Sequence, residues 1–261
     1  YLRESKRPIG EHVGEFIQAL EAKGSGRKHL GSTRTYIERV ATLSRVERIA
    51  DLTPTAVAVA ITILKGEGLS ARAINAHVTA LKAFSRWLRV DGRTPDHALE
   101  SLSKRNEKAD PRRRRRALSP DEARRLIQAT EREPSRWGLS GPDRAMAYAL
   151  ALGTGFRLAE LRSLTPERFD LEGDPPTVTI LAGYSKNGKT AVQPLPESLA
   201  DRLRLWLVAK PSSRPVFAGM TDRAGAMIRD DLRAAGIEPA TDSGVLDFHA
   251  LRTSYISHLV A

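Results

Sequence analysis

The sequence predicts a multidomain protein in which an all-α domain is followed by a mixed α+β domain. In the first hundred residues, apolar residues recur only at helical spacing, and glycines separate the segments. Short strand-like segments occur only in the second half. Between the halves lies a basic stretch with Pro111, which cannot continue a packed helix. We therefore expect domains at residues 1–105 and 118–261, joined by a basic linker at 106–117.

The expected helices of the first domain begin or end at recognisable signals. The second opens with Ser32 or Thr33 as a candidate N-cap, and the third starts at a Thr-Pro pair that includes Pro54. The fourth ends at Gly92. Its apolar stripe is expected to form core: Ile74, Val78, Leu81, Phe84 and Leu88.

The second domain is expected to combine helices with a β-hairpin. The segment LSPDEARRLI has a serine N-cap, proline at the first helical position and acids in the first turn. Residues 143–164 predict a buried helix, a Gly-Thr-Gly turn and a second helix. The segments TVTILAG and TAVQPLP predict two strands around the turn YSKNGK. Further helices are expected at residues 196–210, 224–236 and 248–261.

The charge of the chain favours a polyanionic partner, because the net charge is +11 and the pI is near 10.2. Residues 1–110 contain 19 Lys and Arg against 13 Asp and Glu, whereas residues 117–261 contain 18 of each. A surface that binds phosphates without reading sequence is therefore expected before residue 117. The lack of cysteine excludes disulfides, thiolate zinc sites and cysteine nucleophiles. No apolar stretch of the sequence is long enough for a membrane span.

Five consecutive arginines form the most basic run: Arg112, Arg113, Arg114, Arg115 and Arg116. One interpretation is a solvated linker, and the other is a linker that lies along DNA phosphates. We favour the second, because five adjacent cations seldom gather without an anion nearby.

Three places in the net-neutral half have candidate chemistry. Arg157 opens a helix just after Gly155, where backbone N–H groups and a guanidinium can converge on an anion. Glu160 lies on the same helical face and can hold that guanidinium. Lys186 and Lys189 lie in the hairpin turn, from which an ammonium group can reach into a cleft. Each of these signals is weak alone.

The third place is the segment FHALRTSY, in which His249 and Arg252 share a helical face. Taken in order, the three places resemble the fingerprint of the tyrosine recombinase (phage integrase) family. That fingerprint has Arg in a TG-x-R-x-x-E-L helix, Lys in a β-hairpin, and then His-x-x-Arg. The matching residues here are Thr154, Gly155, Arg157, Glu160, Leu161, Lys186, His249 and Arg252.

The resemblance implies a helical, SAM-like core-binding domain followed by a tyrosine-recombinase catalytic domain. It implies a site-specific recombinase or integrase that binds double-stranded DNA. Such enzymes exchange strands by transesterification through a 3′-phosphotyrosyl intermediate, as homotetramers on paired sites, with no metal or other cofactor. A cytoplasmic, nucleoid-associated location without a membrane partner follows from this function. The target sequence and the host element stay open.

Within this resemblance, each site residue has an expected role. Arg157 and Arg252 would stabilise the charge that develops on the phosphate, with Glu160 in support. Lys186 would donate a proton to the departing 5′-oxygen, and Lys189 remains the alternative in the same turn. His249 would hold or move a proton at the same phosphate.

The nucleophilic tyrosine is expected beyond residue 261, so the catalytic domain would be incomplete and the chain would bind DNA without covalent cleavage. Tyr255 lies about one helical turn after Arg252. We expect it to pack in the core with Ile256 and Leu259 rather than attack phosphorus. The other tyrosines that match no nucleophile position are Tyr36, Tyr148 and Tyr184.

Two other functions remain open. A type IB topoisomerase uses similar Arg, Lys, Arg and Tyr chemistry, and a DNA-relaxation assay would separate it from a recombinase. A DNA-binding relative without cleavage would keep the basic first half and lose the pocket residues. All four candidate catalytic residues are present, which argues against that relative: Arg157, Lys186, His249 and Arg252.

Overall fold

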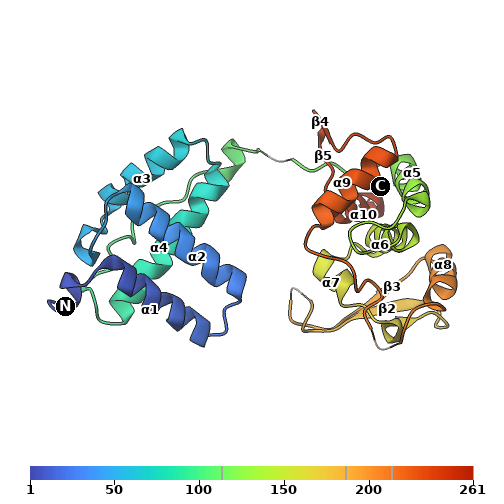
Figure 1. The fold of residues 1–261 in the computed structure, drawn as a ribbon, viewed down its shortest axis with the longest axis horizontal. Helices are drawn as coiled ribbons and strands as arrows, with labels where there is room; N and C mark the ends of the chain where they lie inside the picture. Colours follow the sequence, from blue (N-terminus) through green and yellow to red (C-terminus); the bar gives the residue numbers. More distant parts are fainter. Residues whose placement is uncertain (113, 186, 213, 261) are drawn as a thin grey trace. The chain divides into compact units, whose positions relative to one another are not determined.

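A computed structural model describes residues 1–112, 114–185, 187–212 and 214–260 of the chain. It forms two compact units, Tyr1–Arg112 and Arg113–Ala261 (Figure 1). The division between them falls inside the stretch predicted to be the linker. Two residues of the predicted site, Arg113 and Lys186, lie outside the described residues. In the described ranges, no helix is both long enough and apolar enough to cross a membrane.

Helices make up the regular structure that is described in the first unit. The long helices are α1 (Ile9–Ala22), α2 (Arg27–Leu43), α3 (Pro54–Gly66) and α4 (Ala71–Val90). Short 3-10 turns lie at η1 (Glu4–Lys6), η2 (Ile49–Asp51) and η3 (Glu107–Ala109). α2 packs against α1, α3 and α4, and the predicted apolar stripe of α4 is buried in this core. The hydroxyl groups of Thr53 and Ser70 cap α3 and α4 by accepting bonds from backbone N–H groups.

The predicted start of the second helix is wrong. α2 begins at Arg27, and its N-cap is Gly26 rather than Ser32 or Thr33. The backbone N–H groups of His29 and Leu30 both donate to the Gly26 carbonyl oxygen, which closes the first turn early. The Ser32 hydroxyl donates to the His29 carbonyl oxygen, as a residue inside a helix does.

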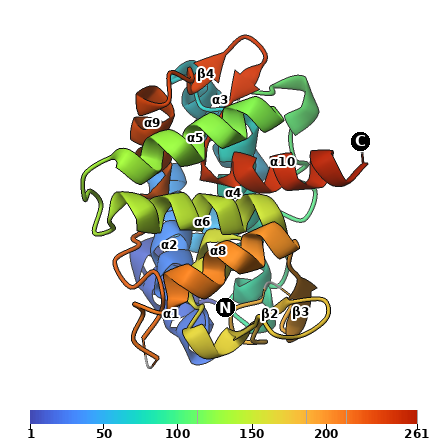
Figure 2. The same ribbon diagram turned by 90° about the vertical axis from the view of Figure 1, so that its right-hand side faces the viewer.

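The second unit combines helices with small antiparallel sheets. Its helices are α5 (Pro120–Arg132), α6 (Gly141–Thr154), α7 (Leu158–Arg162), η4 (Pro166–Arg168), α8 (Glu197–Leu207), α9 (Ala224–Ala234) and α10 (Phe248–Val260). One sheet has the order β1 (Phe169–Asp170), β2 (Thr177–Ile180), β3 (Ala191–Pro194), and the other pairs β4 (Ala240–Thr241) with β5 (Gly244–Val245). Figure 2 shows α5, α6 and α8 side by side, with α6 in the middle.

The sequence predicted the β2–β3 hairpin but not β1, β4 or β5. In the hairpin, Val178 pairs with Gln193 and Ile180 pairs with Ala191. The start of α5 has the predicted serine N-cap and first-turn acids, and these form a capping box in which Ser119 and Glu122 bond each other's backbone N–H groups.

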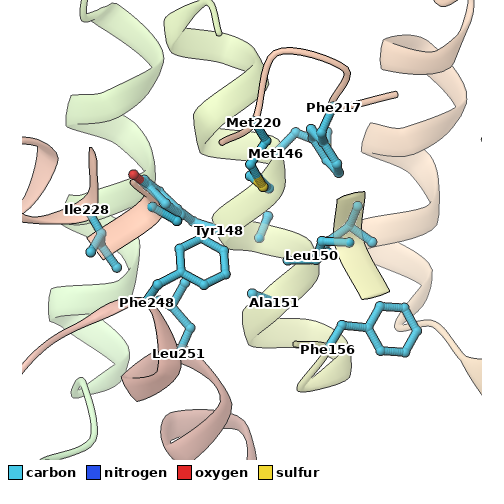
Figure 3. Packing of buried hydrophobic residues seen from close by; sticks show 14 of the residues in the cluster. Met146, Tyr148, Leu150, Ala151, Phe156, Phe217, Met220, Ile228, Phe248 and Leu251 are labelled. Atoms are coloured by element: carbon cyan, nitrogen blue, oxygen red, sulfur yellow. The ribbon is translucent and has the colours of Figure 1, made fainter. Parts of the chain in front are cut away.

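The core of the second unit is built on α6. Residues 145–151 of this helix are all buried. Figure 3 shows Tyr148 of α6 beside Phe248 and Leu251 of α10, and Met146 beside Phe217. The rings of Tyr148 and Phe248 have their centroids 6.1 Å apart. The first turns of α10 are therefore anchored in the core.

A buried ion pair also joins α6 to α9. The guanidinium of Arg144 donates to both carboxylate oxygens of Asp231, at 2.9 and 3.0 Å, and both residues are almost fully buried. Its Nη1 atom donates to the carbonyl oxygens of Pro134 and Leu139, each at 3.0 Å. The Tyr148 hydroxyl donates to Asp231 at 2.6 Å. This network satisfies the buried charge and fixes α6 relative to α9.

Candidate active site

Arg157 lies at the turn between α6 and α7, where it is the N-cap residue of α7. The Glu160 carboxylate accepts bonds from the Arg157 backbone N–H at 2.7 Å and from its Nη1 atom at 2.9 Å. Glu160 is buried, whereas the Arg157 side chain is 36% exposed. The structure thus shows the predicted contact, in which Glu160 orients a guanidinium that solvent and ligands can still reach.

Gly155 connects this turn to α10. Its φ of +68° is left-handed, and a Cβ atom built on it would lie 2.4 Å from the Tyr255 ring. Only glycine therefore fits this position without a shift of the ring. The Gly155 carbonyl oxygen accepts a bond from Nη1 of Arg252 at 2.5 Å. As a result, Arg252 is held at the same turn that leads into Arg157.

His249 lies on the first turn of α10, exposed at the surface. Partial burial of its ring and the positive charge of Arg115 lower the pKa of His249, and the charges of Arg252 and Arg157 act in the same direction. The carboxylate of Asp247 opposes this shift. His249 lies about one helical turn before Arg252 on α10, and Arg252 bonds the turn that leads into Arg157, so these three predicted residues come from adjoining segments.

The lysine hairpin reaches this site through its second strand, β3. Gln193 of β3 donates a hydrogen bond from Nε2 to the Tyr255 hydroxyl at 2.9 Å. Lys189 is exposed in the loop between β2 and β3, and Lys186 lies outside the described residues. The structure therefore connects the hairpin to α10 and leaves the choice between the two lysines as a prediction.

Tyr255 does not pack as expected from the sequence. Ile256 and Leu259 are 48% and 67% exposed, so the expected core cluster with Tyr255 is wrong. The helical face that bears Ile256 and Leu259 points away from the core, while the Tyr255 ring packs on Gly155 and its hydroxyl accepts the bond from Gln193. Tyr255 thus supports the active-site turn.

The other tyrosines have surroundings unlike those of a nucleophile. Tyr148 is fully buried, and burial together with the negative charge of Asp231 raises its pKa well above the usual value. Tyr184 is exposed on the lysine hairpin. Tyr36 belongs to the first unit, where its ring lies 4.5 Å from that of His77.

The arginine run does not form one uniform surface. Arg112 bonds the carboxylate of Asp110 and the carbonyl oxygen of Gly68 within the first unit. Arg113 lies outside the described residues, and Arg114 is exposed. The guanidinium of Arg116 forms two bonds of 2.8 Å with Glu122, and Arg115 bonds Asp247. The sequence prediction treated all five as phosphate contacts, yet Arg112, Arg115 and Arg116 also have protein carboxylates as partners.

Sequence reasoning missed Asp247 as a member of the site. Its Oδ1 atom accepts a bond from the backbone N–H of Ala250 at 3.0 Å, which caps the first turn of α10. An aspartate directly before a helical segment is an N-cap signal, so Asp247 could have been found from the sequence FHALR and the residue before it. No local sequence pattern indicates that Gln193 bonds Tyr255.

The described residues offer no alternative centre for metal chemistry. Within them, His, Cys, Asp and Glu side chains form no cluster of three or more that could hold a metal ion. The charged groups gathered at the site are two guanidinium groups, an imidazole and the carboxylates that orient them.

Comparison with known proteins gives relatives along the whole chain. Residues 116–261 match the model of the phage integrase family. A tyrosine recombinase XerC of Chromobacterium violaceum is 25% identical over 258 residues, which cover 97% of this chain and 82% of that relative. A tyrosine recombinase XerC of Xanthomonas campestris pv. campestris is 32% identical over 201 residues, which cover 74% of this chain and 57% of the relative.

The fold also resembles those of solved integrase structures. A lambda integrase dimer bound to a COC′ core site matches with a TM-score of 0.73 at 18% identity, covering 96% of this chain and 89% of that chain. The Tn1549 transposon integrase in complex with a circular intermediate DNA matches with a TM-score of 0.66 at 14% identity, covering 97% of this chain and 87% of that chain.

The family match spans more than half of the chain and includes every predicted catalytic residue. In the structure, Arg252 is held at the turn that leads into Arg157, and His249 lies on the same helix as Arg252. The chain therefore belongs to the phage integrase family and is a tyrosine recombinase.

Proposed function

We propose that this chain binds duplex DNA and activates one of its phosphodiesters for site-specific strand exchange. The main observation in support is that two guanidinium groups are held in place at the same turn. Arg157 is oriented by the buried Glu160, and Arg252 is oriented by the carbonyl oxygen of Gly155. A phosphodiester is the anion that needs two such forked donors when phosphorus becomes five-coordinate.

The chemistry of the two arginines follows from their permanent charge. As a nucleophile adds to phosphorus, negative charge grows on the two non-bridging oxygens. Arg157 and Arg252 stay protonated at any working pH and can each donate to one of these oxygens. Because Glu160 and Gly155 already fix their directions, little reorganisation is needed at the moment of reaction.

Proton transfer is assigned to His249 and to a lysine of the hairpin. We assign Lys186 as the donor of a proton to the departing 5′-oxygen, with Lys189 as the alternative. Neighbouring arginines favour the neutral imidazole of His249, since they lower its pKa. A neutral His249 can accept a proton from an attacking hydroxyl and return it in the reverse step.

The nucleophile is assigned to a tyrosine other than Tyr148 and Tyr255. Tyr148 is buried and Tyr255 is engaged with the active-site turn, so neither is placed to attack phosphorus in line with the leaving oxygen. In the proposed reaction, the tyrosine oxygen bonds to phosphorus as the bond to the 5′-oxygen breaks. This step gives a 3′-phosphotyrosyl intermediate and a free 5′-hydroxyl group.

DNA binding is assigned to both units. Residues 1–105 would form the core-binding domain and residues 118–261 the catalytic domain, and the excess positive charge lies before residue 117. In support, the similar lambda integrase was solved as a dimer on a core site and as a tetramer bound to a Holliday junction. We assign the same assembly, a homotetramer on paired sites, to this protein, acting on DNA in the cytoplasm without a cofactor.

The proposal is tested first by DNA selection and footprinting. The chain should select a preferred duplex from a random library and protect a defined segment of it from cleavage. Arg157→Ala and Arg252→Ala should keep most of this binding, because the phosphate contacts of the whole surface dominate affinity. A chain that enriches no duplex over random DNA would contradict site-specific recognition.

A nicked substrate then tests the assignment of the nucleophile. Such a substrate traps a covalent protein–DNA adduct because the cleaved end diffuses away. This chain should give no adduct, whereas a longer form that supplies the nucleophilic tyrosine should give one. An adduct formed by this chain and lost in Tyr255→Phe would show that Tyr255 is the nucleophile.

A further inference from the structure

Residues 114–116 are part of the second unit and lie against the start of its last helix. The Val245 backbone N–H donates to the Arg114 carbonyl oxygen at 2.8 Å, and the Arg116 N–H donates to the Val245 carbonyl oxygen at 3.3 Å. Arg115 thereby forms a parallel bridge with Val245 of β5. Gly244 permits this approach, because a Cβ atom on it would lie 2.7 Å from the Arg114 carbonyl oxygen.

This backbone pairing directs the Arg115 side chain to the start of α10. The Nε atom of Arg115 lies 3.0 and 2.9 Å from the two carboxylate oxygens of Asp247. Oδ1 of Asp247 also accepts the bond from the Ala250 N–H that caps α10. A continuous chain of contacts therefore runs from the arginine segment, through Asp247, to the helical turn that bears His249.

The charges on this chain of contacts act on His249 in opposite directions. Arg115 is cationic and disfavours the imidazolium form, and Asp247 is anionic and favours it. The other charged groups that act on the ring are Arg252 of the same helix and Arg157 of the turn before α7. Both of these arginines already have assigned positions at the phosphate, whereas Arg115 has no role in the proposed chemistry.

We propose that Arg115 is a positioning residue for His249: its ion pair with Asp247, which caps α10, fixes the helical turn that bears the imidazole. The inference deepens the proposed function, since it assigns the placement of His249 to the segment that leads into the second unit. It separates Arg115 from its neighbour Arg116, which pairs with Glu122 instead.

The geometry explains why this role needs an arginine or another cation at position 115. Without the guanidinium, the Asp247 carboxylate would lose a cation that it bonds through both oxygens. The positive charge of Arg115 would also no longer act on His249. Both changes favour the imidazolium.

The test is an NMR titration of the histidine ring protons in the DNA-free chain, which needs no catalytic activity. A His249→Gln variant assigns the His249 signal among the six histidines of the sequence. Arg115→Gln should raise the pKa of His249, and Asp247→Asn should lower it. Arg115→Lys should restore a value close to that of the unchanged chain, because it keeps the charge next to Asp247.

Arg116→Gln is the matched control, because it removes a neighbouring arginine that forms an equally short ion pair with a different helix. It should leave the His249 titration unchanged. Thermal unfolding of every variant shows whether a shift has a purely structural cause. If Arg115→Gln does not fold, the His249 titrations of Asp247→Asn and Arg115→Lys still test whether the Arg115–Asp247 ion pair acts on His249.

The inference is overturned if Arg115→Gln and Arg116→Gln move the His249 titration equally, or if Asp247→Asn moves it upward. These outcomes concern only the free chain. The proposed activity on DNA is tested separately, so a failure of either proposal can be told apart from a failure of the other.

Discussion

Arg252 donates a hydrogen bond to the carbonyl oxygen of Gly155, two residues before Arg157. The two arginines assigned to the phosphate are therefore fixed by one short turn, although they lie far apart in the sequence. Glu160 holds Arg157 from the other side of that turn. This arrangement explains why a family fingerprint that is scattered along the chain can act as one unit.

Gly155→Ala should damage both the stability and the site. The left-handed φ of +68° and the Tyr255 ring at 2.4 Å from a new Cβ atom each oppose alanine. We expect a loss of about 1–3 kcal/mol in the free energy of unfolding, measured with urea. Gly225→Ala, inside α9 with nothing within 4 Å of its Cβ position, is the control and should be neutral or stabilising by up to about 1 kcal/mol. Equal effects of the two changes would contradict this account of the turn.

Asp231→Asn should be among the most destabilising changes in the second unit. It removes the carboxylate that neutralises the buried Arg144 and accepts the Tyr148 hydroxyl. Because an unpaired buried charge remains, the expected loss is about 3–5 kcal/mol in chemical denaturation. Asp222→Asn, which breaks the exposed pair with Arg162, should cost less than about 1 kcal/mol. A small loss for Asp231→Asn would mean that water reaches Arg144.

The members of the arginine run should differ in their effect on DNA binding. Arg114 is exposed, whereas the Arg116 side chain is 17% exposed and bonds Glu122 with both Nη atoms. Arg114→Ser should weaken binding to all duplexes alike and lower the slope of log K against log salt by about 1. Arg116→Ser should leave that slope nearly unchanged. If sequence discrimination collapsed and the slope held, the assignment of Arg114 to phosphates would be wrong.

The stability of the first unit should fall in mild acid because of His12. This side chain is fully buried, with Arg93 donating to Nδ1 at 2.9 Å and the Glu4 carbonyl oxygen 3.2 Å from Nε2. Burial lowers the pKa of His12 below its usual 6.5, so the unfolded chain binds the proton more readily. The contribution of neutral His12 to the free energy of unfolding is complete above about pH 6.5. It is lost as the pH falls to the lower pKa that His12 has in the folded state.

Urea titrations from about pH 7.5 to about pH 5 measure this dependence. His12→Gln can keep both hydrogen bonds without a titrating group and should make stability less dependent on pH. His29→Gln, at an exposed position of α2, should leave the dependence as it is. If the stability of His12→Gln depended more steeply on pH than that of the unchanged chain, His12 would not be the group responsible.

Local sequence signals predicted most elements of the fold. Ser119 and the Thr-Pro pair that includes Pro54 marked two helix starts, and the hydroxyl groups of Ser119 and Thr53 bond backbone N–H groups three residues on. The start of α2 was missed because Gly26 acts as the cap without any side chain. The strands β4 and β5 are two residues each, too short for an alternating pattern.

The site residues were predicted by their order, and the Arg157–Glu160 contact by its spacing, but the long-range contacts were not predicted. The partner of Arg115 lies 132 residues away, and the partner of Arg252 lies 97 residues away. Neither contact has a local pattern, because each depends on how α10 docks on α6. Because such contacts leave no local pattern, the five arginines were predicted to form one phosphate-binding surface. In the structure, Arg112, Arg115 and Arg116 each pair with a different carboxylate.

Arg157 and Arg252 are proposed to activate a phosphodiester, and this role can be tested without a tyrosine nucleophile. A nicked duplex of the selected site, with its 3′-phosphate esterified to p-nitrophenol, isolates this step. The 5′-hydroxyl oxygen of the nick attacks phosphorus and its proton passes to the hairpin lysine, which would protonate the same oxygen in the forward step, while p-nitrophenolate leaves with the electron pair of the broken bond.

The measurement is the rate of p-nitrophenolate release on this duplex. The chain should release it and join the strands, and Arg157→Ala and Arg252→Ala should each slow release by about a hundredfold or more while Arg162→Ala does not. No release above background by the DNA-bound chain, or equal rates for Arg157→Ala and Arg162→Ala, would contradict the account.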